Sequence, residues 1–184
     1  MSSSFLYFLG AVETCLHTGS AEEGLDCVKK VLDSSVSQGD CKESKELPEQ
    51  CSNYNVLDSR SRNYMVTEHN FCSDHYCCDQ AGYDPYVRPD WKGDGWYRIM
   101  GEAGTKIIDA PVDQYHCGTS ATGWLSGEHP SPGEGLVTRK VCFKDYYGND
   151  CAYQADVDVL NCNNAYFVYY LVDTPWCVMG YCTE

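Results

Sequence analysis

The sequence predicts a β-rich or small α+β domain that is held together by disulfides, has many loops and carries a short N-terminal appendage. Two observations favour this class. Thirteen cysteines are spread along 184 residues instead of gathering in two C-x-x-C pairs, which is typical of disulfides formed in an oxidising compartment. After Cys51, short apolar runs alternate with turn residues, which is the pattern of many short strands.

The amino-acid composition limits which classes of binding partner are expected. Asp and Glu number 27 against 13 Lys and Arg, so the formal net charge is −14. Such a chain repels a phosphate backbone, and we expect no nucleic-acid partner. The charge favours cationic partners and loose binding of divalent cations. No apolar run reaches the length of a membrane span, so we expect none.

The N-terminus resembles a secretory signal peptide over residues 1–21. The apolar run of residues 5–12 precedes small residues that end at Ala21, although no Lys or Arg comes before it. Cleavage there would remove Cys15 and leave twelve cysteines, enough for six bridges. The alternative is a truncated start, with Cys15 paired to Cys27 or Cys41.

Residues 22–50 form an acidic appendage without aromatic residues. Apolar residues recur at helical spacing over residues 24–33, which predicts a short amphipathic helix. Residues 34–50 are predicted to be a polar linker. Cys27 and Cys41 are expected to form additional bridges that hold this appendage.

Residues 51–184 form the predicted domain. We expect a hairpin in which strands at residues 96–100 and 105–108 flank a four-residue loop. Further strands are predicted at 135–143, around 157–159 and at 166–172, the last apolar on both faces and therefore central. Five glycines and two prolines predict an ordered loop at 117–135.

The search for catalytic motifs finds none, and we predict a protein that is not an enzyme and has no cofactor. Cys117 lies beside His116, with His129 further on, but in a secreted chain a half-cystine is favoured over a reactive thiolate. Asp156 and Asp158 share one face of a predicted strand. They are candidates for weak calcium binding, although a solvated strand face is the favoured interpretation.

The only dense cysteine cluster is at residues 72–78. Cys72, His75, Cys77 and Cys78 have the residue types of a zinc site. The favoured interpretation is that Cys77 and Cys78 enter different disulfides, because neighbouring side chains in extended backbone point in opposite directions. We therefore predict no metal site.

Six phrases from residue 95 onward resemble the eight-cysteine domain of the uromodulin family, which includes the pancreatic zymogen-granule membrane glycoprotein. Leu57-Asp58 with Arg60 or Arg62 resembles the opening of that domain, so the resemblance covers about residues 51–184. The six phrases are residues 95–101, 117–119, 123–130, 135–143, 166–169 and 177–183.

The resemblance implies a disulfide framework. It takes one cysteine of the 72–78 cluster together with seven others, which are Cys51, Cys117, Cys142, Cys151, Cys162, Cys177 and Cys182. Family members of the uromodulin type have two more cysteines where this chain has Pro111 and Ala152, which implies that one bridge is lost. The two spare cysteines of the cluster are available to pair with Cys27 and Cys41.

The family's vertebrate members resemble decoys that display a mannose-rich glycan to bacterial adhesins. Their asparagine lies within the phrase equivalent to residues 169–172, and no N-x-S/T sequon occurs anywhere in this sequence. The resemblance therefore implies the family's scaffold and an extracellular location. Because the sequon is missing, we expect no N-glycosylation and no glycan-decoy function.

The best candidate for a ligand surface is the segment of residues 79–93, where Tyr83, Tyr86 and Trp91 alternate with prolines. Aromatic residues on a stiff loop offer large contact area at low entropic cost; the alternative is that they cover the edge of the core. We predict a secreted, non-enzymatic module that binds an extracellular protein or glycan. The second hypothesis is an acidic component of an extracellular or mineral matrix with weak calcium binding. The sequence leaves the oligomeric state open.

Overall fold

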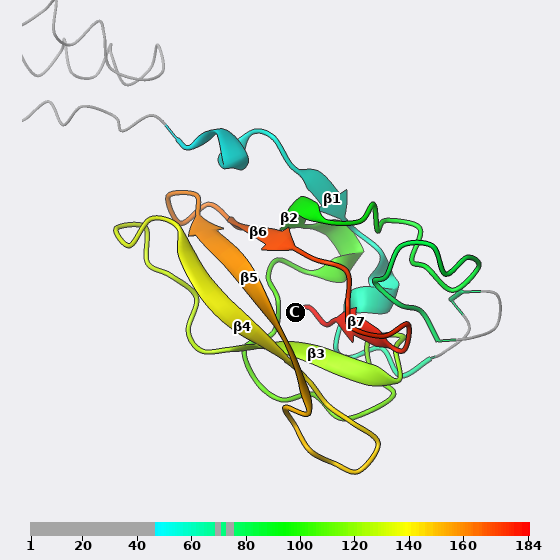
Figure 1. Cartoon of the computed structure of the whole chain (residues 1–184). Coiled ribbons are helices and arrows are strands. Elements are labelled where there is room, and N and C mark those ends of the chain that lie inside the picture. The colour runs from blue at the N-terminus through cyan, green and yellow to red at the C-terminus, as the bar shows by residue number, and fades with distance from the viewer. Residues whose placement is uncertain (1–46, 69–70, 73–75) are drawn as a thin grey trace, which may run out of the picture. The chain divides into compact units, whose positions relative to one another are not determined.

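The computed structural model describes residues 47–184 except 69–70 and 73–75. The expected signal peptide, the helix at 24–33 and the bridges of Cys27 and Cys41 lie outside the described residues. Within them, one seven-stranded sheet runs in the order β1-β2-β6-β5-β4-β3-β7 (Figure 1). The strands are β1 Asn55–Leu57, β2 Gly95–Ile99, β3 Ala121–Ser126, β4 Val137–Phe143, β5 Tyr153–Asn161, β6 Phe167–Leu171 and β7 Met179–Tyr181.

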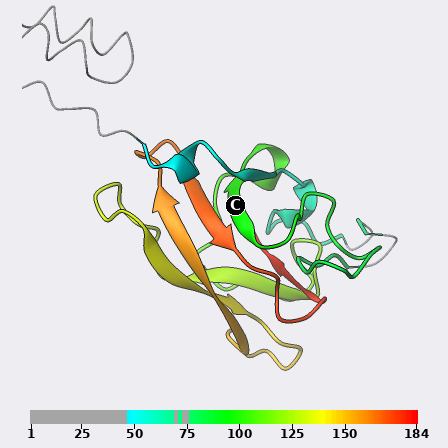
Figure 2. The same cartoon turned by 45° about the horizontal axis from the view of Figure 1, so that its top comes forward.

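Most neighbouring strands are antiparallel, and only the two outermost pairs, β1 with β2 and β3 with β7, are parallel. β4 and β5 form the longest ladder, with Val137 opposite Val159 and Phe143 opposite Tyr153. Figure 2 shows how strongly the strands twist across the sheet, as right-handed strand twist requires. Three single-turn 3₁₀ helices complete the elements of the described residues, η1 Glu49–Cys51, η2 Arg60–Arg62 and η3 Gly101–Ala103. The prediction of a β-rich, disulfide-bonded domain is confirmed.

The main core lies on one face of the sheet. It takes alternate residues of each strand, such as Tyr97 and Ile99 of β2 and Tyr169 and Leu171 of β6, all of which are buried. A second, smaller cluster lies on the other face of β5 and β6, where η1 brings Cys51 against Leu160, Cys162 and Val168. β6 is therefore buried on the core face and, at Val168, on the opposite face, where Tyr170 is exposed; it lies inside the sheet, as its sequence predicts.

The predicted hairpin at residues 96–108 is wrong in its second strand. β2 forms as expected, but it pairs with β1 and β6. After η3 the chain instead follows the C-terminal residues: Ile107 bridges Thr183, and the Ile108 amide donates to the Cys182 carbonyl at 3.1 Å. The glycines at 101 and 104 both have positive φ, and they turn the chain away from β2 before it can pair back.

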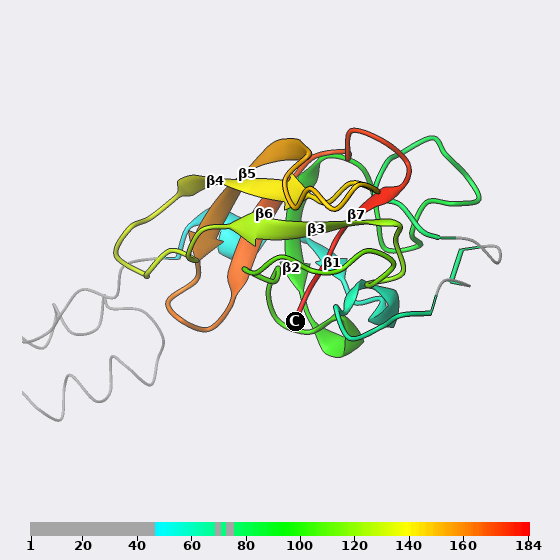
Figure 3. The same ribbon diagram turned by 90° about the horizontal axis from the view of Figure 1, so that it is seen from below.

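The predicted loop at residues 117–135 contains a strand. β3 lies between β4 and β7 in the sheet (Figure 3), and the loop was predicted because glycines and prolines are frequent in and around this strand. A Cβ at Gly123 would come within 2.8 Å of the Gly180 carbonyl oxygen and closer still to the Phe143 ring. Glycine here lets two backbones approach closely, which is a recognised role of glycine inside a strand.

Candidate ligand-binding surfaces

Five disulfides join the ten cysteines that the structure describes. They are Cys51–Cys162, Cys72–Cys77, Cys78–Cys177, Cys117–Cys182 and Cys142–Cys151. Cys77 and Cys78 enter different bridges, as expected. The expected pairing of two cluster cysteines with Cys27 and Cys41 is wrong, because Cys72 and Cys77 are close enough to bond to each other, with a Cα–Cα distance of 5.3 Å.

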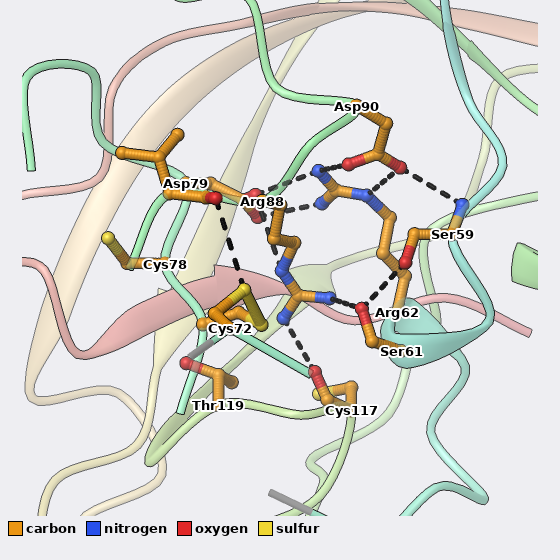
Figure 4. Close-up of a disulfide and its surroundings, with 12 residues drawn as sticks. Ser59, Ser61, Arg62, Cys72, Cys78, Asp79, Arg88, Asp90, Cys117 and Thr119 are labelled. Carbon is orange, nitrogen blue, oxygen red and sulfur yellow. Dashed lines mark hydrogen bonds and ion pairs between the residues drawn. A yellow bond between two sulfur atoms is a disulfide. The ribbon is translucent and has the colours of Figure 1, made fainter. Parts of the chain in front are cut away.

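Four charged side chains form a buried cluster, Arg62, Asp79, Arg88 and Asp90, which we call the arginine–aspartate cluster (Figure 4). Arg62 donates from both terminal nitrogens to the Asp79 carboxylate at 2.8 Å. Asp79 also accepts the backbone N–H of Tyr181 at 2.8 Å. The bidentate pair and the extra donor satisfy a carboxylate that would otherwise be very costly to bury.

The other two members tie the cluster to neighbouring segments. The Asp90 carboxylate accepts two hydrogen bonds from Arg62 and one from each backbone N–H of Asp58 and Ser59. Arg88 donates to the Ser61 hydroxyl at 3.1 Å and to the Cys117 carbonyl at 2.5 Å. The cluster therefore fixes both ends of the loop 79–90 against η2 and the Cys117–Cys182 bridge (Figure 4).

Because of the arginine–aspartate cluster, the stability of the fold is expected to fall at acid pH. Burial alone would raise the pKa of Asp90, but the charge and hydrogen bonds of Arg62 outweigh burial and lower that pKa from 3.8 to about 2. A carboxyl whose folded-state pKa is depressed stabilises the fold above its unfolded pKa and loses that contribution as pH falls through the folded value.

We therefore expect Asp90 to contribute about 2 kcal/mol of stability at pH 5 and above, lost between about pH 4 and pH 2. Urea unfolding at a series of pH values measures this loss. In Asp90→Asn the fall over the same window should be shallower, since the titrating group is gone. Equal slopes for the two proteins would show that the Asp90–Arg62 pair does not control acid stability.

The predicted ligand surface of Tyr83, Tyr86 and Trp91 is only partly at the surface. Tyr83 and Tyr86 are 49% and 38% exposed, but Trp91 is 4% exposed. The Trp91 ring stacks on Tyr97 and Tyr181, at centroid distances of 5.0 and 5.8 Å. Trp91 as a ligand contact is therefore wrong, because its ring is packed in the main core and hidden from solvent.

A different set of aromatic side chains surrounds a groove at the turn between β4 and β5. We call it the aromatic groove; it has a volume of about 210 Å³. Tyr146, Tyr147, Tyr153 and Trp176 line it and are all exposed, Tyr147 by 96% and Trp176 by 60%. Single exposed aromatics are ordinary, whereas four around one hollow mark an interaction surface.

The β4–β5 side of the aromatic groove is held rigidly. The Asp145 carboxylate accepts the backbone N–H groups of Tyr147 and Asn149 at 2.8 and 3.0 Å, which closes the turn. The Cys142–Cys151 bridge crosses the base of the same hairpin. Both tyrosines are therefore presented on a backbone that loses little freedom on binding.

The other side of the groove is equally constrained. The Trp176 carbonyl accepts the backbone N–H groups of Val178 and Met179 at 2.8 and 3.1 Å. The next residue, Cys177, is bonded to Cys78. Trp176 is thus an exposed indole on a tight turn that is covalently attached to the loop 79–90.

The charge around the aromatic groove is negative. Lys144 forms ion pairs with Asp113 at 3.1 Å and Asp150 at 3.0 Å, and Asp145 adds a third carboxylate. The two carboxylates that pair with Lys144, the further carboxylate of Asp145 and the electron-rich ring faces together favour a cationic group as the ligand.

A larger groove lies beside β2 and β6 and contains Arg98. We call it the arginine groove; its volume is about 440 Å³. Its other principal lining residues are Met100, Asn161, Asn164, Tyr166 and Phe167. It lies on a different part of the sheet from the β4–β5 turn and shares no lining residue with the aromatic groove.

The remaining candidates have structural partners. Asp156 pairs with Lys140 across β4 and β5 at 2.8 Å, and Asp158 accepts the Thr138 hydroxyl at 2.7 Å. No group of three metal-ligating side chains occurs among the residues that the structure describes. Cys117 is a half-cystine. The cross-strand pairs of Asp156 and Asp158 are typical of a solvated strand face.

Comparison with known proteins identifies the fold's family. Residues 97–183 match the family model described as the uromodulin-like domain. The chain belongs to the uromodulin-like domain family. The resemblance seen in the sequence is thereby confirmed, and with it an extracellular, disulfide-bonded class of domain.

Relatives of this uromodulin-like domain extend beyond the matched segment. The pancreatic secretory granule membrane major glycoprotein GP2 of Canis lupus familiaris is 35% identical over 134 residues, which are 73% of this chain and 23% of that protein. The Homo sapiens GP2 protein is 35% identical over 66% of this chain and 21% of its own length. Uromodulin of Mus musculus is 32% identical over 90% of this chain and 22% of its own length. The chain therefore spans between a fifth and a quarter of the length of these relatives.

Among the residues described, no helix of this uromodulin-like domain has the length and apolar character to cross a bilayer.

Sequence reasoning missed the aromatic groove. Tyr146 and Tyr147 are adjacent, and Gly148 follows them with a positive φ of 89°. Two adjacent aromatics at the tip of a short turn cannot both reach the core, and this was the signal that could have found them. Trp176 carried no comparable signal.

Proposed function

We propose that this uromodulin-like domain is a non-enzymatic extracellular binding module, and that its aromatic groove takes a cationic side chain of a protein partner. The observation that carries the proposal is the group of four exposed aromatic side chains that line the groove, three of them on two constrained turns and Tyr153 at the start of β5. Tyr and Trp are the residues that most often dominate binding energy in protein interfaces.

Charge favours a basic partner over a neutral one. Asp145 lines the groove, Asp113 and Asp150 pair with its Lys144, and the whole chain carries a formal charge of −14. A Lys or Arg side chain gains from the ring faces of Trp176 and Tyr147 and from these carboxylates together. An acidic partner would be repelled.

A non-enzymatic role agrees with the state of the reactive groups. The thiol of Cys117 is consumed in a bridge. His129 is mostly buried, shares a hydrogen bond with the Tyr169 hydroxyl at 2.9 Å and lies 3.4 Å from Asp109. Burial lowers the pKa of His129, and neither His129 nor these two partners line the aromatic groove or the arginine groove.

The test is a pair of matched peptide libraries, one with a single Arg or Lys in each member and one with Gln in that place. We expect saturable binding of basic peptides, weaker at high salt, and at least a tenfold loss in Trp176→Ala. Tyr83→Ala is the control, because it also removes an exposed aromatic but lies outside the aromatic groove. It should bind like the parent.

Two results would overturn the proposal. One is equal binding of the Gln library, since charge would then play no part. The other is binding of neutral glycans on an array with the same dependence on Trp176, which would make the groove a sugar site. Calcium-dependent self-association that Trp176→Ala leaves unchanged would instead support the acidic matrix component; because Asp156 and Asp158 already have cross-strand partners, we expect none.

A further inference from the structure

Arg98 is unusual in so acidic a chain because it forms no ion pair with a carboxylate in the described part of the structure. Except for Lys92, every other Arg and Lys there is paired with Asp or Glu. The charge of Arg98 is therefore not neutralised by a neighbouring side chain, although carboxylates outnumber basic groups two to one in the sequence.

The guanidinium of Arg98 is nevertheless held in one place. It lies 3.7 Å from the ring centroid of Tyr166 and donates to the Tyr54 hydroxyl at 3.0 Å. Tyr166 in turn donates to the Cys51 carbonyl at 2.6 Å, beside the Cys51–Cys162 bridge. The Nε atom of Arg98 is buried and has no hydrogen-bond partner. A guanidinium that is fixed by stacking and pairs with no carboxylate is preorganised to bind an anion.

The arginine groove has room for a small ligand. Its volume of about 440 Å³ lies within the range of about 300 to 1,000 Å³ that is typical of small-molecule sites. Beside Arg98 it offers the apolar surfaces of Met100 and Phe167 and the amide of Asn164. The side-chain oxygen of Asn164 accepts from Asn161 at 3.4 Å, which leaves its amide nitrogen as a donor.

We propose that the arginine groove binds the carboxylate of an acidic sugar, with Arg98 as the anion-binding group. A uronic or sialic acid residue combines the three features that the groove matches: a carboxylate for the guanidinium, hydroxyl groups for Asn164, and an apolar ring face for Phe167. This site is separate from the aromatic groove and takes a ligand of the opposite charge, so it does not rest on the function proposed above.

The test uses methyl glucuronoside and the methyl glycoside of N-acetylneuraminic acid as probes, titrated into the disulfide-bonded protein and followed by NMR. We expect saturable binding of at least one of them. The neutral methyl glucoside and the amide of the glucuronoside should bind at least tenfold more weakly, because both lack the anion.

Arg98→Gln should weaken binding of the acidic sugar by roughly tenfold or more. Lys92→Gln is the matched control, since it removes the same charge from a residue that also lacks a carboxylate partner but does not line the groove. It should bind within about twofold of the parent.

A second variant keeps the test decisive if Arg98→Gln folds poorly. Asn164→Asp adds a negative charge at an exposed position, keeps the acceptor for Asn161, and suits the positive φ of 61°. It should weaken acidic sugars more than neutral ones, because both lose the amide donor but only the acidic sugars are repelled by the added charge.

Three outcomes would overturn the proposal: no saturable binding of either acidic sugar, equal losses in Arg98→Gln and Lys92→Gln, or binding of peptide carboxylates without binding of acidic sugars.

Discussion

Replacement of Asp79 by alanine is expected to cost about 3 to 5 kcal/mol of unfolding free energy, a large share of the stability of an ordinary domain. Asp79 is completely buried and is the shared partner of Arg62 and Arg88. Its removal leaves the Arg62 guanidinium with one carboxylate instead of two, and leaves the Tyr181 N–H without its acceptor. Buried charge that loses its partner is among the most destabilising of single changes.

Urea unfolding of the secreted protein measures the effect. Asp113→Ala is the matched control, because it also breaks an Asp–cation pair but at a side chain that is 86% exposed. An exposed ion pair contributes no more than about 1 kcal/mol. If Asp79→Ala does not accumulate, Asp79→Asn keeps the shape and removes only the charge. A midpoint for either Asp79 variant equal to that of Asp113→Ala would refute the structural role of the cluster.

Removal of the Cys51–Cys162 bridge is expected to cost about 4 to 5 kcal/mol, whereas removal of Cys72–Cys77 should cost about 2 kcal/mol. The two bridges close loops with sequence separations of 111 and 5 residues. Closing a long loop restricts the unfolded chain more than closing a short one, so the long bridge contributes more.

Double alanine variants, Cys51→Ala with Cys162→Ala and Cys72→Ala with Cys77→Ala, separate loop length from loss of sulfur. All four cysteines are buried, so the cavities left behind are comparable. Denaturant midpoints in the absence of reductant give the two costs. If the short bridge proved as costly as the long one, restriction of the unfolded chain would not be the source of stability.

The sequence predicts the sheet better than its pairing. The runs at residues 137–143 and 167–171 are recognisable from their apolar character and from the turn residues around them, and both are strands. The partner of residues 105–108 could not be predicted, because Ile107 pairs with Thr183 at the far end of the chain. When a short strand pairs with a segment far away in the sequence, its own local sequence does not identify that partner.

The two tryptophans Trp91 and Trp176 show the same limit for the candidate site. Trp176 directly follows a proline, and Trp91 is separated from one by a single residue. Both lie in polar, turn-rich segments, so the local sequence does not distinguish them. Trp91 is buried because Tyr97 and Tyr181 receive its ring, while Trp176 is exposed on a turn attached through Cys177. Burial of an aromatic ring on a loop is decided by such remote partners.

The most direct test of the binding-module account is to map a bound basic peptide onto the folded domain by NMR chemical-shift perturbation. We predict that the largest shifts fall on the Trp176 indole and on the backbone amides of Tyr146 and Tyr147, and that Trp176→Ala abolishes them. Shifts that cluster instead at Tyr83 and Tyr86, or that spread over the surface without saturating, would contradict the assignment of the aromatic groove as the ligand site.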